Sequence, residues 1–365
     1  AFGKKNYKVL KSIYFNILFM KKNIRELKFF ELEELFQKLK EPRYRPSQIY
    51  RWLWKEKVQS FDQMTNISKS CRDYLNQNFT INYVANKTQI FSKDGTIKFL
   101  FKLHDGNTCE GVLIPEKNRI TACVSSQVGC SFSCKFCATG QMKRKRNILS
   151  YEIYDQVSLM IDESRNQYKK SLTNIVYMGM GEPLVNYQNV VDSIKYITNK
   201  EGLNMSSKRI TLSTVGVSKM IKKLADEDLK INLAVSLHSA NNFKRSEIMD
   251  INSINDLDNL KDALIYFFDK TKTKITYEYV MLKDFNDTQQ DALDLVKFSK
   301  IVPSKINLIE FNSVEKSNFQ KSTDETTKEF ISILKKENII VNLRRSRGED
   351  VNAACGQLAN LIDIC

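Results

Sequence analysis

Three cysteines stand close together in the stretch "CSFSCKFC", which places Cys130, Cys134 and Cys137 in a C-x3-C-x2-C spacing. Thiolates are soft ligands that suit an iron–sulfur cluster or zinc. A tetrahedral zinc site needs a fourth ligand, and the chain has only two histidines, His104 and His238. No fourth cysteine continues the regular spacing. We therefore expect a [4Fe-4S] cluster that is held by three cysteines and keeps one iron open.

Another cysteine, Cys355, lies in "NAACGQLAN", among small residues and far from this cluster motif in the sequence. A lone cysteine among alanines is most often a small packing residue of the core. The alternative is that Cys355 reacts with a group elsewhere in the chain. Its small neighbours Ala353, Ala354 and Gly356 would let the backbone come close to a ligand and move. These residues alone leave both interpretations open.

The elements that must position these cysteines follow a regular pattern from about residue 119 onward. Short apolar stretches such as "RITACVSS" and "TNIVYMGM" alternate with longer amphipathic stretches such as "SYEIYDQVSLMIDESR". Strict alternation of strands and helices predicts a parallel sheet with right-handed crossovers. We expect an α/β fold with a partial (β/α) barrel of about six parallel strand–helix units. In such a barrel the chemistry belongs at the carboxyl ends of the strands.

Two shorter regions precede the expected barrel. From about 20 to 80, apolar residues recur at helical spacing and predict a small N-terminal helical domain that carries aromatic and basic residues together. The next stretch alternates apolar and polar positions around Asp-Gly turns, which predicts a short antiparallel β extension. The expected division is an N-terminal extension at 1–19, an accessory helical domain at 20–80, a β-hairpin linker region at 81–118, the partial barrel at 119–350 and a C-terminal cysteine segment at 351–365.

Composition limits the class of protein and its partners. With 365 residues, 42% of them hydrophobic and 27% charged, the chain is typical of a folded globular protein and unlike a disordered one. The formal net charge is +15, which favours a polyanionic partner, nucleic acid first and an acidic membrane surface second, or serves solubility alone. The apolar run at 13–20 is too short to cross a bilayer, and no small-residue signal-peptidase cleavage site follows it. We therefore expect no secretory signal.

Several motifs together resemble a known family. "CVSSQVGCSFSCKFCATG" and "MGMGEPLVN" resemble the cluster loop and the Gly-Glu segment of the radical-SAM superfamily. With "RITLSTVGV", "AVSLHS", "KINLIEFN" and "RGEDVNAACGQL", the chain looks like the radical-SAM RNA adenine methyltransferases of the RlmN/Cfr family. The stretch "YRPSQIYRWLWKEKVQSFDQMTNISKSCR" resembles the accessory helical domain of that family. The resemblance runs from about residue 24 to the end of the sequence.

The resemblance implies S-adenosylmethionine as the second cofactor, bound at the open iron of the cluster. The family's cofactor contacts, carried over to matching positions of this chain, are Gly181, Glu182, Ser213, Ser236, Leu237, His238 and Asn312. Each of these residues also has an ordinary structural interpretation, as a turn former, a strand end or a core side chain. Their shared place at the carboxyl ends of strands favours the binding role.

The resemblance also implies roles for three further residues. Cys355 matches the S-methylcysteine intermediate, which takes a methyl group and passes it on through a covalent RNA adduct. Cys123, in "TACVSS", matches the resolving thiol that forms a transient disulfide with Cys355. Glu110, in "CEGVLIPE", matches a proton acceptor that also positions the base, the alternative being a solvent-facing strand residue. A disulfide that must be reduced in every turnover fits a cytoplasmic protein.

The implied function is methylation of C2 of an adenosine in 23S rRNA and in a subset of tRNAs, next to the anticodon. The main alternative is methylation of C8 of the same rRNA adenosine, as in the antibiotic-resistance branch. A metal-stabilised RNA-binding protein without activity and a radical enzyme for small molecules are further alternatives. Expected partners are 23S rRNA, tRNA and an electron donor of the flavodoxin or ferredoxin type. We expect a monomer without a membrane partner.

Overall fold

The computed structural model describes residues 21–315 and 317–359 and divides the chain into two compact units. Among the described residues, one unit comprises 21–83 and 200–203, and the other comprises 84–199 and 204–359. The expected N-terminal extension at 1–19 lies outside the described residues. In the described part of the chain, no helix combines the length and the apolar character that a bilayer crossing requires.

The first unit is helical. Its main elements are α2 (Phe29–Lys38), α3 (Arg45–Trp54) and α4 (Lys69–Asn78), with β1 (Lys22–Asn23) pairing in parallel with β2 (Phe79–Thr80). The "EPRYRP" break separates α2 from α3, and Pro46 then fits the first turn of α3, where no backbone N–H is needed. Trp54 is buried in the small core, whereas Trp52 is partly exposed and donates from its indole N–H to Asn66 Oδ1 at 2.6 Å.

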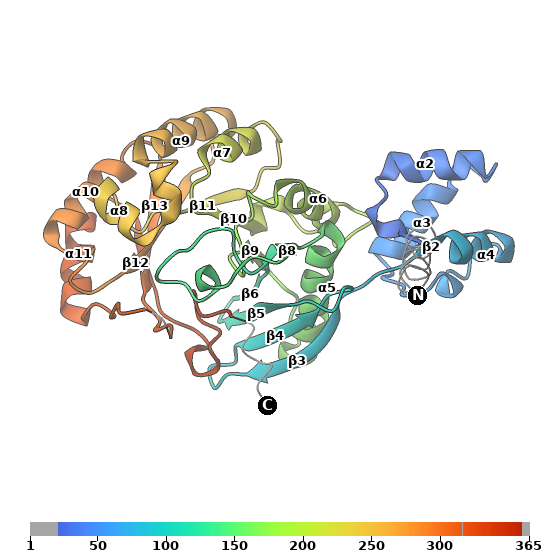
Figure 1. The fold of residues 1–365 in the computed structure, drawn as a ribbon, viewed down its shortest axis with the longest axis horizontal. Coiled ribbons are helices and arrows are strands. Elements are labelled where there is room, and N and C mark those ends of the chain that lie inside the picture. The colour runs from blue at the N-terminus through green and yellow to red at the C-terminus, as the bar shows by residue number, and fades with distance from the viewer. Residues whose placement is uncertain (1–20, 316, 360–365) are drawn as a thin grey trace, which may run out of the picture. The chain divides into compact units, whose positions relative to one another are not determined.

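The second unit is built on one ten-stranded sheet in the described part of the chain, in the order β14-β13-β12-β11-β10-β9-β6-β5-β4-β3. The parallel strands are β6 (Arg119–Cys123), β9 (Asn174–Tyr177), β10 (Ile210–Thr214), β11 (Asn232–Ser236), β12 (Ile275–Met281), β13 (Ser304–Glu310) and β14 (Val341–Arg344). The crossover helices are α5 (Ser150–Tyr168), α6 (Tyr187–Thr198), α7 (Ser218–Ala225), α9 (Leu257–Thr271), α10 (Gln289–Ser299) and α11 (Asp324–Lys336). Figure 1 shows these helices around the outside of the strands. The expected partial barrel is confirmed.

The antiparallel extension continues the sheet of the barrel. Strands β3 (Ala85–Phe91), β4 (Ile97–Lys102) and β5 (Thr108–Glu116) pair antiparallel, and β5 then pairs with β6. The region 81–118, expected as a hairpin linker, therefore supplies three strands of the sheet and its β3 edge. The short strands β7 (Gln127–Val128) and β8 (Arg146–Asn147) pair with each other and frame the cysteine loop. Helix α8 (Asn242–Ile248) follows β11 and was not expected, because its seven residues carry little helical periodicity.

Candidate active site

Three of the site's side chains are directed to one face of the sheet by strand register. Lys98 lies opposite Val112, and Val112 lies opposite Cys123. Residues that lie opposite each other face the same side, and successive residues alternate, so Glu110 shares this face. Gly111 points to the other side, where an added Cβ would collide with a side chain of α5. Lys98, Glu110 and Cys123 therefore face the interior of the barrel.

Register brings a second polar group to the same interior face. Ser236 pairs with Glu278, and Glu278 pairs with Asn307. Asn342 pairs with Asn307, and Arg344 follows two residues later on the same face. The Glu278 carboxylate accepts from Asn307 Nδ2 at 2.9 Å and from an Arg344 guanidinium N–H at 3.2 Å. A buried carboxylate and a partly exposed guanidinium thus stand at the far edge of the site.

The cysteine loop is held against the strand ends. Cys134 is buried in an apolar cluster with residues of α8, β12 and the segment after β13. Phe136, between two of the cysteines, packs edge-on against the His238 ring with centroids 4.6 Å apart. Burial raises the pKa of Cys130 to about 11 and that of Cys134 well above its usual range, and the charge of Cys137 raises both further. Such thiols need a bound cation to remain thiolates at neutral pH.

The Gly-Glu segment, Gly181 and Glu182, lies beside this loop, and its backbone conformation leaves no space for a side chain at Gly181. Gly181 has φ of 92°, and an added Cβ would lie 2.4 Å from Gln127 Cβ. Gln127 Oε1 in turn accepts from the Glu182 N–H at 3.0 Å. The Glu182 carboxylate accepts from the N–H groups of Leu184 at 3.0 Å and Val215 at 2.9 Å. Burial raises the pKa of Glu182 to about 7, and these hydrogen bonds oppose that shift.

The "SLH" segment after β11 reaches the same place. His238 has a left-handed backbone with φ of 56°, which is strained for a residue with a Cβ. Its Nδ1 accepts from the Val280 N–H at 3.0 Å, so in the neutral ring the proton sits on Nε2. Burial, together with the positive charge of Arg245, lowers the pKa of His238 to about 3. Leu237 is fully buried and Ser213 nearly so.

The segment that carries Cys355 lies over the cysteine loop. Asn312 Nδ2 donates to the Cys355 carbonyl at 3.2 Å. The N–H of Ala138, next to the last cysteine of the loop, donates to the Gly356 carbonyl at 2.7 Å. The Thr139 hydroxyl donates to the Leu358 carbonyl at 2.5 Å. These contacts join the C-terminal segment to the loop, and the Cys355 side chain is exposed.

Glu110 lies under the end of that segment. Its carboxylate is fully buried and its Oε1 lies 2.8 Å from Lys98 Nζ, with Lys98 itself 1% exposed. Its Oε2 accepts from the Ala359 N–H at 2.9 Å. The alternative of a solvent-facing Glu110 is thereby excluded. The carboxylate instead stands in the interior, within reach of the segment that bears Cys355.

The two cysteines far apart in sequence lie within electrostatic reach of each other. Burial is the main factor that raises the pKa of Cys123 to about 12, and the charge of Cys355 raises it further. The protein packed around Cys355 raises its pKa to about 11, although solvent reaches the side chain. The positive charge of Arg344 acts in the opposite direction and lowers the pKa of both thiols. Both thiols are free in this structure.

Comparison with known proteins agrees with this geometry. The chain is 53% identical over 339 residues to the probable dual-specificity RNA methyltransferase RlmN of Cytophaga hutchinsonii, covering 93% of both chains. It is also 53% identical to the corresponding protein of Christiangramia forsetii, over 93% of this chain and 97% of the relative. The chain belongs to the RlmN family of dual-specificity RNA methyltransferases.

Two family models and one solved structure agree with RlmN membership. Residues 22–81 match the ribosomal RNA large subunit methyltransferase N-terminal domain, and residues 124–296 match the radical SAM superfamily. A crystal structure of a radical SAM methyltransferase from Sphaerobacter thermophilus superposes with a TM-score of 0.86 at 36% identity. That match covers 92% of this chain and 99% of the other. The similarity therefore extends over both units.

Radical SAM membership implies a [4Fe-4S] cluster and S-adenosylmethionine, and the residues present fit the cluster. In the described ranges, no group of three or more His, Cys, Asp or Glu side chains could hold a single metal ion. A cluster differs because each cysteine binds a different iron, so the sulfurs stand further apart. Cys130, Cys134 and Cys137 form an all-thiol donor set on one loop and influence one another's charge. This donor chemistry suits iron–sulfur binding.

Residues that sequence reasoning missed in this RlmN-family site are charged side chains inside the barrel. Lys98 lies within "TIKFLF", where a single lysine in an apolar strand was the available signal. Arg344 could not be recognised as a site residue from the sequence, because two adjacent arginines, Arg344 and Arg345, are typical of an exposed strand end. Arg245 of α8 is fully buried and donates to the carbonyls of Leu237 at 3.1 Å and Val215 at 2.6 Å. It fixes the strand ends that carry the "SLH" and "TLSTVG" motifs.

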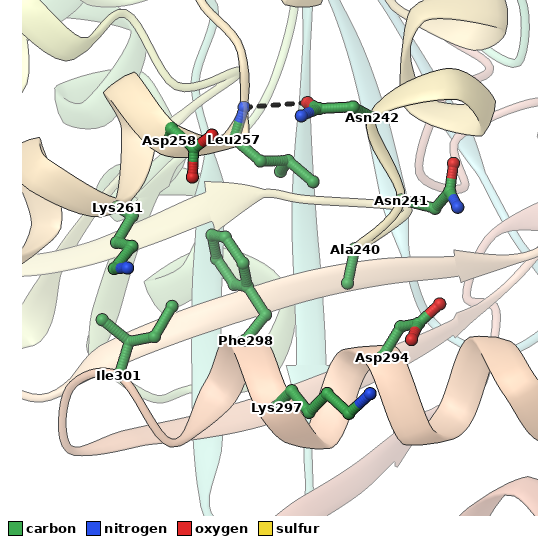
Figure 2. Close-up of a pocket in the computed structure, with 10 residues that line it drawn as sticks. All are labelled: Ala240, Asn241, Asn242, Leu257, Asp258, Lys261, Asp294, Lys297, Phe298 and Ile301. Carbon is green, nitrogen blue, oxygen red and sulfur yellow. Dashed lines mark hydrogen bonds between the residues drawn. The ribbon is translucent and has the colours of Figure 1, made fainter.

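A surface pocket elsewhere contains none of the expected site residues. It lies between the start of α8, α9 and α10, and Figure 2 shows Asp258, Lys261, Asp294 and Lys297 around it. The one hydrogen bond drawn there runs from the Leu257 N–H to Asn242 Oδ1 at 3.0 Å and ties α9 to α8. Its lining mixes acids and lysines without an excess of either sign. We assign it no role in the reaction.

Proposed function

We propose that this enzyme methylates C2 of an adenosine in 23S rRNA and in tRNA through a methyl group carried on Cys355. The observation that carries the proposal is the position of Cys355: exposed, above the cysteine loop and within electrostatic reach of Cys123. A thiol buried in a remote core could neither take a methyl group from S-adenosylmethionine nor form a disulfide with Cys123. Membership of a family of dual-specificity RNA methyltransferases supports both RNA substrates.

The chain's own residues would act as follows. The Cys355 thiolate attacks the methyl carbon of one S-adenosylmethionine, forming a carbon–sulfur bond while S-adenosylhomocysteine leaves. When bound, the cluster supplies the electron that cleaves a second S-adenosylmethionine to a radical able to remove hydrogen from the S-methyl group. After the methylene carbon has bonded to the base, the adduct would return one electron to the cluster and lose the proton of the substituted base carbon. Cys123 then attacks the Cys355 sulfur, the carbon–sulfur bond breaks, and its electron pair stays with the carbon, which takes up a proton to become the methyl group. The resulting disulfide is returned to two thiols by an external thiol reductant.

The binding roles follow from position. We propose that Gly181, Glu182, Ser213, Ser236, Leu237, His238 and Asn312 hold S-adenosylmethionine, and that Cys130, Cys134 and Cys137 hold the cluster. The neutral His238 ring keeps one N–H on Nε2 for donation. Glu110 is proposed to accept a proton or hold the base. For the base to reach it, the Ala359 N–H must first leave the carboxylate. Arg344 favours the thiolate forms of both reacting cysteines.

RNA is proposed to contact the helical unit, where Arg43, Tyr44 and Arg51 are exposed. We expect binding of substrate RNA to weaken at least about tenfold between ~50 and ~200 mM salt, because phosphate contacts release counterions. Replacing Arg43 and Arg51 by alanine should reduce the slope of log Kd against log salt. The control is Lys230→Ala, an exposed lysine two residues before β11. A salt-independent Kd would contradict the electrostatic part of the proposal.

The remaining partners are inferred from the chemistry. One-electron reduction of the cluster requires a donor, for which we propose a small protein of the flavodoxin or ferredoxin type. Repeated reduction of the Cys123–Cys355 disulfide fits the reducing cytoplasm. Because one chain supplies every proposed site residue, we propose that a monomer is sufficient for activity.

The deciding experiment is mass spectrometry of nucleosides from a bacterial host that lacks its own enzyme. Expression of this chain should restore 2-methyladenosine in 23S rRNA and in tRNA. The control is the Cys355→Ala variant, which should restore neither. The appearance of 8-methyladenosine would show the alternative C8 chemistry, and the absence of both products from a folded, cluster-containing enzyme would overturn the proposal.

A further inference from the structure

The two edges of the sheet meet through a contact that lies just before Cys355. Strand β14 is one edge of the ten-stranded sheet that the structure describes, and β3 is the other. Residues that follow β14 nevertheless touch the turn between β3 and β4, and Figure 1 shows the C-terminal segment (red) beside these strands. The segment therefore bridges the open side of the barrel.

Each side of this contact contributes one carboxylate, Asp350 from the segment after β14 and Asp94 from the turn between β3 and β4. The Ser92 hydroxyl lies 2.6 Å from the Asp350 carboxylate and 2.9 Å from that of Asp94, and its single proton is donated over the shorter distance, to Asp350. The Lys93 N–H also donates to the Asp350 carboxylate, at 3.1 Å. The Gly348 N–H donates to the Asp94 carboxylate at 3.0 Å. We call these five residues the turn clasp. Hydrogen bonds to ionised carboxylates are among the strong ones.

The backbone of the clasp leaves little freedom. Gly348 has φ of 68°, and an added Cβ would lie 2.9 Å from Thr96 Cγ2 and 2.8 Å from Ala353 Cβ. The Gly348 carbonyl also accepts from the Ala353 N–H at 2.8 Å. By contrast, the left-handed residues Asn352 and Gly356, with φ of 51° and 85°, flank Cys355. The fixed part of the segment thus extends through Ala353, and Gly356, which has no Cβ, is the residue beside Cys355 whose backbone can change conformation most easily.

We propose that the turn clasp is the positioning element of the methyl-carrying cysteine. It anchors the segment up to Ala353, so that movement is confined to residues 354–356 when Cys355 passes from methyl acceptor to partner of Cys123. This movement releases the Asn312–Cys355 hydrogen bond. Ser92 and Asp350 are positioning residues, since neither is placed to touch substrate or cofactor. The inference rests on the proposed function for its biological purpose, although the geometry of the two thiols can be tested separately.

The test measures how fast the Cys123–Cys355 disulfide forms when a mild two-electron thiol oxidant, diamide, is added to the anaerobically purified holoenzyme. Asp350→Ala and Ser92→Ala should each slow this disulfide by about fivefold or more, as expected for loss of a hydrogen bond to a charged group. In the double variant the two effects should be less than additive, because the Ser92–Asp350 contact is lost in both single variants. Asp350→Asn keeps an acceptor oxygen and should recover much of the rate.

The matched control is Glu349→Ala, an exposed acid next to Asp350. Within the described part of the chain its side chain has no hydrogen bond or ion pair with the turn, so the substitution should leave the rate unchanged. Iron–sulfur absorbance and melting temperature should stay close to the parent values in all variants. Parent-like disulfide rates in Asp350→Ala and Ser92→Ala would overturn the proposal, as would an equal loss in Glu349→Ala. The assay uses neither RNA nor S-adenosylmethionine, so failure of the proposed methyl transfer would be seen elsewhere, as a wild-type enzyme without S-methylated Cys355.

Discussion

Replacing Cys123 by alanine is expected to turn the enzyme into a trap for its own RNA. Cys355 can still take the methyl group and bond to the base, but no thiol remains to attack its sulfur. The covalent protein–RNA complex should therefore accumulate while methylated product falls by at least about a hundredfold, as for loss of a nucleophile. Denaturing gel electrophoresis with labelled RNA would show the complex, and nuclease digestion with mass spectrometry would locate it on Cys355.

Two controls make this prediction specific. Cys355→Ala should give neither complex nor product, because the carrier itself is absent. Cys109→Ala replaces another fully buried cysteine, one position before Glu110 and therefore on the opposite face of β5, and should keep both product formation and turnover. A Cys123→Ala enzyme that releases methylated RNA at the parent rate, or a Cys355→Ala enzyme that keeps activity, would show that another residue carries the methyl group.

Replacing Lys98 by methionine is expected to destabilise the second unit severely. Lys98 and Glu110 are 2% and 0% exposed at their side chains, with Nζ and Oε1 2.8 Å apart. Methionine fills similar space but leaves a buried carboxylate without its cation, a loss of about 3–5 kcal/mol in the free energy of unfolding. Denaturant unfolding followed by circular dichroism would measure it.

The second substitution of a double-mutant cycle separates charge from packing. Adding Glu110→Gln to Lys98→Met removes the orphaned charge and should restore a large part of the lost stability, although not activity. Lys102→Met, on the exposed end of the same strand, is the control and should change stability by less than about 0.5 kcal/mol. If Lys98→Met unfolds at the same denaturant concentration as the parent, the ion pair is not a structural element of the barrel.

Much of the fold followed from local pattern. Alternating strands and helices with good caps, such as Thr288 before α10 and Thr323 before α11, specify the parallel part of the barrel. Clustered motifs such as "CSFSCKFC" were recognisable because their ligands lie within one loop. What local pattern could not supply was the pairing of β5 with β6, which turns the hairpin region into part of the sheet. The two strands are joined by the two-residue turn of Lys117 and Asn118, which lacks the glycine that marks most hairpins in a sequence.

The same limit applies to the site. The burial of Glu110 depends on Lys98, which lies on the neighbouring strand β4, two residues along from the position opposite Glu110, and not in the same motif. The roles of Cys123 and Cys355 came from resemblance, since spacing says nothing about side chains that meet only after the barrel has formed. The contacts of Asp350 were equally hidden, because an exposed aspartate in a polar stretch is ordinarily a solvated side chain.

The turn clasp also has a consequence for how the protein folds. The Ser92–Asp350 contact joins residues separated by 258 positions, across the whole width of the sheet. Closing so long a loop is entropically costly until the intervening strands are in place, so this contact should form late. The reactive cysteine would then reach its position only after the rest of the barrel is complete. Folding intermediates would present a free thiol without an assembled site, and the order of folding itself would keep radical chemistry away from an unfinished protein.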